Sequence, residues 1–230
     1  MLNRVARTGL MVALALGVMG MNGVKVLADE PQVVREDIEW CDVWLPHSNE
    51  HALPRVLLIG DSITRAYYSQ VETALKGKAY VARLATSKSV GDPALLGEVA
   101  LVLDQCKFDV VHFNNGMHGW GYTEAEYQKA FPGFVEIIQK HAPGAKLIWA
   151  TTTPVRVANN VNQVDGRTER VKARNAIAAE IVGKSALPID DIFSLVENHP
   201  EYYSSDGVHS NEKGVEAEAA QVAATILKQL

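Results

Sequence analysis

The 230-residue chain has little of several features that mark particular classes of protein. It contains only two cysteines, Cys41 and Cys106, so folding does not require a disulfide framework, and their spacing matches no metal-binding motif. No cluster of lysine and arginine forms a basic stripe, which argues against a nucleic-acid partner. Beyond the N-terminal region, no internal repeat, low-complexity segment or linker divides the chain. With 47% hydrophobic and 21% charged residues, the composition is that of one globular domain.

Long hydrophobic runs are also absent, except near the N-terminus. There two arginines precede an apolar run from Leu10 to Met21, and Val26-Leu27-Ala28 fits the small-x-small pattern of a cleavage site. We therefore predict a signal peptide over residues 1–28 and a periplasmic or secreted protein, with an uncleaved anchor as the alternative. The run is short for a membrane span of about 20 residues, so we expect no stable membrane insertion. Cleavage would remove three of the 22 basic residues and leave 19 against 27 acidic ones, a net charge near −8.

From residue 55 onward, short runs rich in Val, Ile and Leu alternate with segments of helical periodicity. The runs show little polar alternation, which is typical of strands buried on both faces. The predicted strands are 55–60, 79–85, 109–114, 146–151 and 186–189, and the predicted helices are 64–76, 93–106, 124–141, 167–184 and 212–230. This alternation predicts an α/β fold, a three-layer α/β/α sandwich around a five-stranded parallel sheet. Residues 29–54 are irregular, and we expect an extended segment outside the 55–230 domain.

A serine follows the first of these strands. Ligands bind such sheets at the carboxyl ends of the strands, near the point where strand order reverses, and Gly60-Asp61-Ser62 lies at one such end. A serine on a sharp turn at the positive end of a helix is a candidate nucleophile once a base removes its proton. The structural alternative is that Ser62 only caps the helix.

A candidate base and its orienter lie near the C-terminus, where residues 205–210 read Ser-Asp-Gly-Val-His-Ser. His209 can exchange protons near neutral pH, and Asp206 is close enough along a turn to bond its Nδ1 atom. Alone, this segment could be a turn followed by a surface histidine. Together with Ser62, it predicts a Ser-His-Asp catalytic triad, with no metal and no cofactor.

These motifs resemble those of the SGNH, or GDSL-type, hydrolase family, over residues 55–230. Gly60-Asp61-Ser62-Ile63 is similar to the first block, Ser89-Val90-Gly91-Asp92 to the second and Asp206-Gly207-Val208-His209 to the last. The resemblance implies a flavodoxin-like fold, a Ser62 nucleophile, and an oxyanion hole that includes the backbone N–H groups of Ser62 and Gly91.

The third block departs from the family pattern of Gly-x-Asn-Asp. Here Gly116-Met117-His118-Gly119 stands at the end of the third strand, with His118 where the family places its oxyanion asparagine. A neutral histidine can donate one N–H, so we expect His118 to complete the oxyanion hole. The alternatives are a donor from Asn115 or Asn114, or a histidine that only shapes the pocket.

Two loops are expected to shape the substrate pocket, with Asn115, Trp120 and Arg156 as candidate binding residues. Export, an acidic domain and polar loops favour a serine esterase that hydrolyses short, O-acetyl-type esters on carbohydrate. A broad-range lysophospholipase or thioesterase is the alternative among enzymes, and a lapsed glycan-binding module is the alternative outside them. The sequence leaves open the oligomeric state, the acyl length, and whether Cys41 and Cys106 pair.

Overall fold

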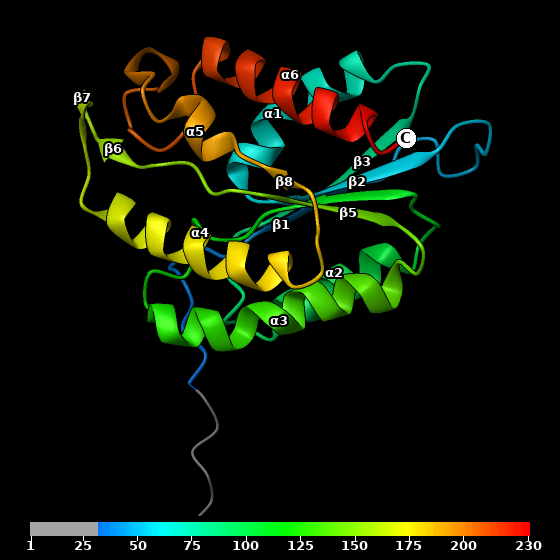
Figure 1. Ribbon diagram of the computed structural model, residues 1–230, viewed down its shortest axis with the longest axis horizontal. Coiled ribbons are helices and arrows are strands. Elements are labelled where there is room, and N and C mark those ends of the chain that lie inside the picture. The colour runs from blue at the N-terminus through cyan, green and yellow to red at the C-terminus, as the bar shows by residue number, and fades with distance from the viewer. Residues whose placement is uncertain (1–31) are drawn as a thin grey trace, which may run out of the picture. The chain divides into compact units, whose positions relative to one another are not determined.

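A six-stranded sheet forms the centre of the protein in the computed structural model, which describes residues 32–230 (Figure 1). The predicted signal peptide lies outside the described residues. Five strands are parallel, as predicted: β2 (Arg55–Gly60), β3 (Tyr80–Thr86), β4 (Val110–Phe113), β5 (Lys146–Ala150) and β8 (Ile189–Asp190). The sixth, β1 (Cys41–Trp44), pairs antiparallel with β3 at the edge of the sheet, so the sequence prediction missed one strand.

The strand order places a topological switch point beside Ser62. Within the sheet the order is β1-β3-β2-β4-β5-β8, so the chain moves from β2 to β3 in one direction and then crosses back past β2 to β4 and on to β5 and β8 in the other. Gly60 is level with Ala85 on β3, and Ile59 is level with Phe113 on β4. The loops that leave these three strands therefore start at the same edge, where ligands bind in open α/β sheets.

Helices cover both faces of the sheet, which confirms the predicted sandwich (Figure 1). One layer contains α1 (Ser62–Ala74), α5 (Ile192–Val196) and α6 (Glu212–Leu227); the other contains α2 (Ala94–Leu103), α3 (Glu124–His141) and α4 (Arg167–Gly183). The five long helices begin and end within a few residues of the predicted bounds. The sequence analysis did not predict α5, the 3₁₀ turn at Pro200–Tyr202, or the hairpin of β6 (Arg156–Val157) and β7 (Asn160–Val164).

Alternate residues of β2 supply the two cores. Val56 and Leu58 pack with α1 and α6 on one face, and Leu57 and Ile59 pack with α2 and α3 on the other. All four are at most 1% exposed. Burial of such a side chain stabilises the fold by about 1.5–3 kcal/mol, so β2 is held rigidly from both sides.

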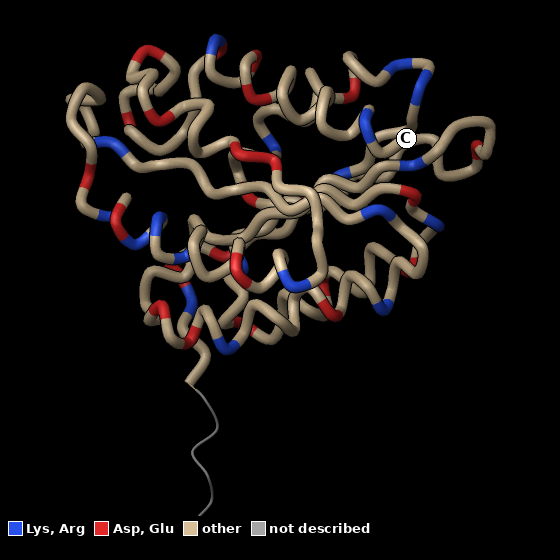
Figure 2. Tube along the Cα trace, in the orientation of Figure 1, with Lys and Arg blue, Asp and Glu red and all other residues tan. Residues whose placement is uncertain are grey.

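Basic and acidic residues are interspersed along the described chain (Figure 2). A buried pair joins two strands, because His112 Nε2 on β4 lies 2.9 Å from Asp190 Oδ2 on β8. Cys41 and Cys106 are both free thiols. Among the helices of residues 32–230, none has the length and apolar character needed to cross a membrane.

Candidate active site

The turn between β2 and α1 presents Ser62 at a helix N-terminus. The Asp61 carboxylate caps the helix by accepting a hydrogen bond of 2.9 Å from the Ile63 backbone N–H. Gly60 is needed for this tight turn, because a Cβ there would lie 2.0 Å from Thr64 Oγ1. Ser62 is the first residue of the helix, so its own N–H has no intrahelical acceptor. The cap is Asp61, and the Ser62 hydroxyl is left for other contacts.

The loop before α6 brings His209 and Asp206 to that hydroxyl. His209 Nε2 lies 2.8 Å from Ser62 Oγ, and His209 Nδ1 lies 2.8 Å from Asp206 Oδ2. The second carboxylate oxygen, Oδ1, accepts hydrogen bonds from the backbone N–H groups of Val208 and His209 and from the Ser204 hydroxyl. A hydroxyl, an imidazole and a carboxylate thus form one hydrogen-bonded line, although Ser62 and His209 are 147 positions apart in the sequence.

The charge state of Asp206 determines which groups donate and which accept in these hydrogen bonds. Partial burial alone would raise the pKa of the Asp206 carboxyl, but hydrogen bonds from His209 and Val208 outweigh it and hold that pKa well below its usual range. An ionised carboxylate only accepts hydrogen bonds, so His209 Nδ1 carries the hydrogen. In a neutral ring Nε2 is then an acceptor, oriented to take the proton of the Ser62 hydroxyl.

Arg156 supports the loop that carries Asp206 and His209. Its backbone N–H donates to the Gly207 carbonyl over 2.7 Å, and its guanidinium donates to the carbonyls of Val161 and Glu197. The guanidinium also lies over the Tyr203 ring, 5.0 Å from its centroid. Arg156 is 4% exposed and is not among the residues that line the pocket described next, so the structure does not place it where the sequence analysis expected a substrate contact.

A pocket of about 260 Å³ opens beside Ser62 and His209. The loop after β4 supplies one wall with Met117, His118 and Trp120. Two of these, His118 and Trp120, were expected at the substrate pocket from the sequence. A further part of the lining comes from the segment before β1 and was not expected; it contains Val34, Arg35 and Glu36, next to the loop after β4.

Two other predicted residues use their polar groups within the protein. Asn115 is 7% exposed, accepts a hydrogen bond of 3.0 Å from the Val90 N–H and donates one of 2.8 Å to the Lys88 carbonyl. The Gly91 N–H lies 3.3 Å from Ser89 Oγ, and a Cβ at Gly91 would meet the Tyr122 ring at 2.8 Å. Neither residue lines the pocket. The hydrogen bonds of Asn115 join two loops, and the lack of a side chain at Gly91 allows close packing against an aromatic ring.

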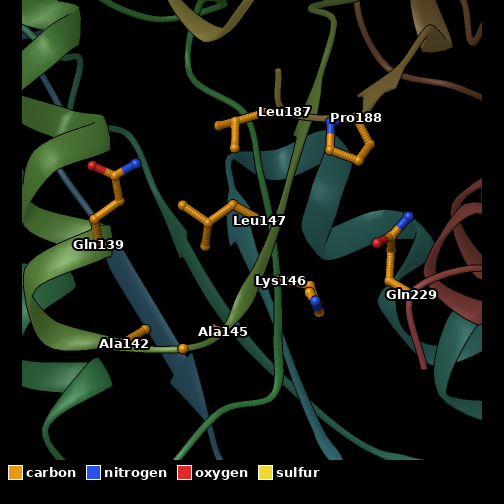
Figure 3. A pocket seen from close by; sticks show the side chains of 9 residues that line it. Gln139, Ala142, Ala145, Lys146, Leu147, Leu187, Pro188 and Gln229 are labelled. Carbon is orange, nitrogen blue, oxygen red and sulfur yellow. The ribbon is translucent and has the colours of Figure 1, made fainter. Parts of the chain in front are cut away.

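A separate hollow of about 300 Å³ lies at the start of β5, at the opposite end of the strands from Ser62 (Figure 3). The side chains labelled there include Gln139, Leu147 and Pro188, with Lys146 as the one charged group among them. They include no histidine, carboxylate or hydroxyl, so this hollow holds no nucleophile and base pair.

Comparison with known proteins places the chain among the ester hydrolases. The sequence model of the GDSL-like lipase/acylhydrolase family matches residues 58–217, and the chain belongs to this family. The matched region contains Ser62, Asp206 and His209. The protein is therefore a carboxylic ester hydrolase of the GDSL type. No curated protein matches the chain.

Solved structures share the fold at low sequence identity. A GDSL-like lipase from Bacteroides thetaiotaomicron is 17% identical, with a TM-score of 0.62, and the alignment covers 76% of this chain and 89% of that one. A carbohydrate esterase of family 3 from Talaromyces cellulolyticus is 17% identical, with a TM-score of 0.61 and coverage of 76% and 97%. An acetyl xylan esterase is 18% identical, with a TM-score of 0.58 and coverage of 75% and 99%. These similarities establish a common fold.

Proposed function

We propose that the protein is an exported serine esterase in which Ser62 attacks the ester carbonyl. His209 takes the serine proton as the Ser62 oxygen bonds to the carbonyl carbon, and then gives that proton to the departing alcohol. Water, deprotonated by the same imidazole, releases the acyl group as an acid and restores the Ser62 hydroxyl. Asp206 orients His209 and stabilises its charged form. The observation that carries the proposal is the pair of 2.8 Å hydrogen bonds that join the three side chains.

The proposed substrate is a short, O-acetyl-type ester on a carbohydrate. A pocket of about 260 Å³ suits a small acyl group, and its walls combine an aromatic ring with charged groups. Trp120 is held there by the guanidinium groups of Arg170 and Arg174, which lie 5.4 and 4.9 Å from its ring centroid. Two proteins of the same fold carry the names carbohydrate esterase and acetyl xylan esterase.

Export is a separate part of the proposal, and residues 1–28 carry it through a basic start, an apolar run and a small-x-small site. The mature protein should begin at Asp29. N-terminal sequencing of the protein recovered outside the cytoplasm checks this, and recovery of the chain with Met1 intact would contradict it.

The catalytic proposal is tested with a fluorophosphonate probe and with hydrolysis of p-nitrophenyl acetate. The probe should label the folded protein at Ser62, and Ser62→Ala should abolish labelling and lower turnover about 10³-fold or more, as should His209→Ala. Ser69→Ala, an exposed serine on the same helix, is the matched control and should retain activity. Folded protein that is not labelled would instead favour a binding module, and a fall of less than about tenfold in Ser62→Ala would exclude Ser62 as the nucleophile.

A further inference from the structure

A second carboxylate–histidine pair lies in the same pocket as the proposed nucleophile. His118 Nδ1 lies 2.9 and 3.0 Å from the two carboxylate oxygens of Glu36. Both residues line the pocket that Ser62 and His209 also line. The His118 side chain is only 17% exposed, so the protein largely surrounds the imidazole. The triad does not use this pair, and the sequence analysis did not connect its members.

Several polar contacts hold Glu36 and the residues around it, in the segment before β1, in place. The Glu36 backbone N–H donates to Glu39 Oε1 over 2.9 Å, and the Glu39 carboxylate in turn lies 2.7 Å from Lys88 Nζ. The neighbouring Arg35 pairs with Asp92 at 2.8 Å. These contacts anchor the segment to the loop that follows β3. Glu36 is therefore positioned before any substrate arrives, which reduces the cost of ordering it on binding.

The pair fixes what His118 can offer to a ligand. A carboxylate only accepts hydrogen bonds, so the hydrogen lies on Nδ1 and is donated to Glu36. A neutral imidazole has one N–H, which leaves Nε2 as an acceptor. Within residues 32–230, Nε2 of His118 makes no hydrogen bond. An acceptor beside a carboxylate is poorly suited to an oxyanion, which needs donors, and is well suited to a hydroxyl group.

We propose that the Glu36–His118 pair is a hydroxyl-recognition site, in which His118 Nε2 accepts a hydrogen bond from a free sugar hydroxyl next to the ester that Ser62 attacks. Glu36 is the positioning residue, because it selects the tautomer of His118. Trp120, on the same wall, offers an aromatic surface to the sugar ring. This inference rests on the proposed esterase function and gives it a specificity: esters of polyhydroxy alcohols over esters of alcohols without a second hydroxyl. It also replaces the oxyanion role that the sequence suggested for His118.

The test compares two substrates that differ only in the hydroxyl groups. One is a methyl xyloside with a single acetyl ester and free neighbouring hydroxyls, and the other is the same ester with those hydroxyls methylated. The wild-type protein should prefer the free-hydroxyl ester in kcat/KM by roughly five- to tenfold, the effect of one hydrogen bond. His118→Phe and Glu36→Ala should bring that ratio close to one. Asp37→Asn, a loss of the same charge one residue away, is the matched control and should keep the wild-type ratio.

Two other outcomes of this comparison overturn the inference, and a third overturns the esterase proposal. If both esters lose rate by the same large factor of about 10²–10³ in His118→Phe, the imidazole acts on the oxyanion instead. If the ratio survives in both variants, the pair recognises no hydroxyl. If the wild-type protein cleaves no ester, the esterase proposal fails. Calorimetric binding of the free-hydroxyl xyloside then decides the inference, which requires weaker binding in His118→Phe than in the wild type.

Discussion

Gly207 lies between the aspartate and the histidine of the proposed triad, in a backbone conformation that residues other than glycine rarely adopt. Its φ is +73°, and a Cβ there would lie 2.2 Å from the Arg156 carbonyl oxygen. That carbonyl belongs to backbone and cannot rotate away, so an alanine must displace the loop that carries His209. A displacement of about 1 Å at a reacting group can cost about 10²-fold in rate.

We therefore expect Gly207→Ala to lower kcat/KM for p-nitrophenyl acetate about 10²-fold, in a protein that still folds. Gly77→Ala is the matched control, because Gly77 also has a positive φ, +75°, but has open space around its Cα. That variant should lose about 1 kcal/mol of stability and retain its rate. Wild-type rates in Gly207→Ala would show that the close approach to Arg156 does not set the position of His209.

At the scale of elements, one buried side chain of α4 organises the loop after β4. Arg174 is 1% exposed and donates hydrogen bonds to the carbonyls of Gly116, His118 and Gly119 over 2.8–2.9 Å. The loop has little regular structure of its own, so these bonds take the place of a strand or helix in fixing it. The wall of the pocket thus depends on a helix about 55 residues further along the chain.

Replacing Arg174 by Met should leave these three carbonyls, two of them in buried contacts, without their donors. We expect Arg174→Met to lower the free energy of unfolding by about 2–4 kcal/mol and to reduce activity strongly. Lys172→Ala, a partly exposed cation on the same helix, should change stability by less than about 0.5 kcal/mol. Chemical denaturation and ester hydrolysis measure both effects. Full activity in Arg174→Met would mean that the loop keeps its shape without the guanidinium.

Elements with a strong local pattern could be predicted from the sequence, and those that depend on distant partners could not. The parallel strands and long helices carry buried, periodic residues, and the types and order of Ser62, Asp206 and His209 are local motifs. By contrast, β1 has four mostly exposed residues and is a strand only because β3 lies beside it. The contact between Glu36 and His118 spans 82 residues and has no local signal. Arg156 was a candidate substrate-binding residue in the sequence analysis, because the sequence does not show the carbonyls to which its guanidinium donates.

At the scale of the whole molecule, the site draws on nearly the full described chain. The N-terminal segment supplies Glu36, β2 leads into Ser62, the loop after β4 supplies His118, and the loop before α6 supplies His209. The switch point of the sheet brings these parts together, since the loops after β2 and β4 leave adjacent strands at the same edge. The geometry of the site therefore depends on the folding of the entire domain.

One buried carboxyl links that stability to pH. Glu218 on α6 is 0% exposed, and its Oε1 accepts a hydrogen bond of 2.6 Å from the hydroxyl of Ser210, the neighbour of His209. Its Oε2 has no partner among the described residues. Burial, opposed by the Ser210 hydrogen bond and reinforced by the charge of Asp61, raises the pKa of Glu218 to about 7 from an ordinary value of 4.5.

Between these two values the folded protein holds a proton that the unfolded chain has lost. The free energy of unfolding contributed by Glu218 therefore falls as pH rises from about 4.5 to about 7, by about 3 kcal/mol, and is constant above that. Glu218→Gln has no charge to bury, and its amide can still accept the Ser210 hydrogen bond. The free energy of unfolding of this variant, relative to that of the wild type, should therefore increase by about 2–3 kcal/mol as the pH rises from 5 to 8. Urea unfolding of both proteins at the two pH values measures this gain, with Glu216→Gln, an exposed change on the same helix, as the control. Equal stability differences at pH 5 and pH 8 would mean that Glu218 ionises in the folded protein as readily as in the unfolded chain.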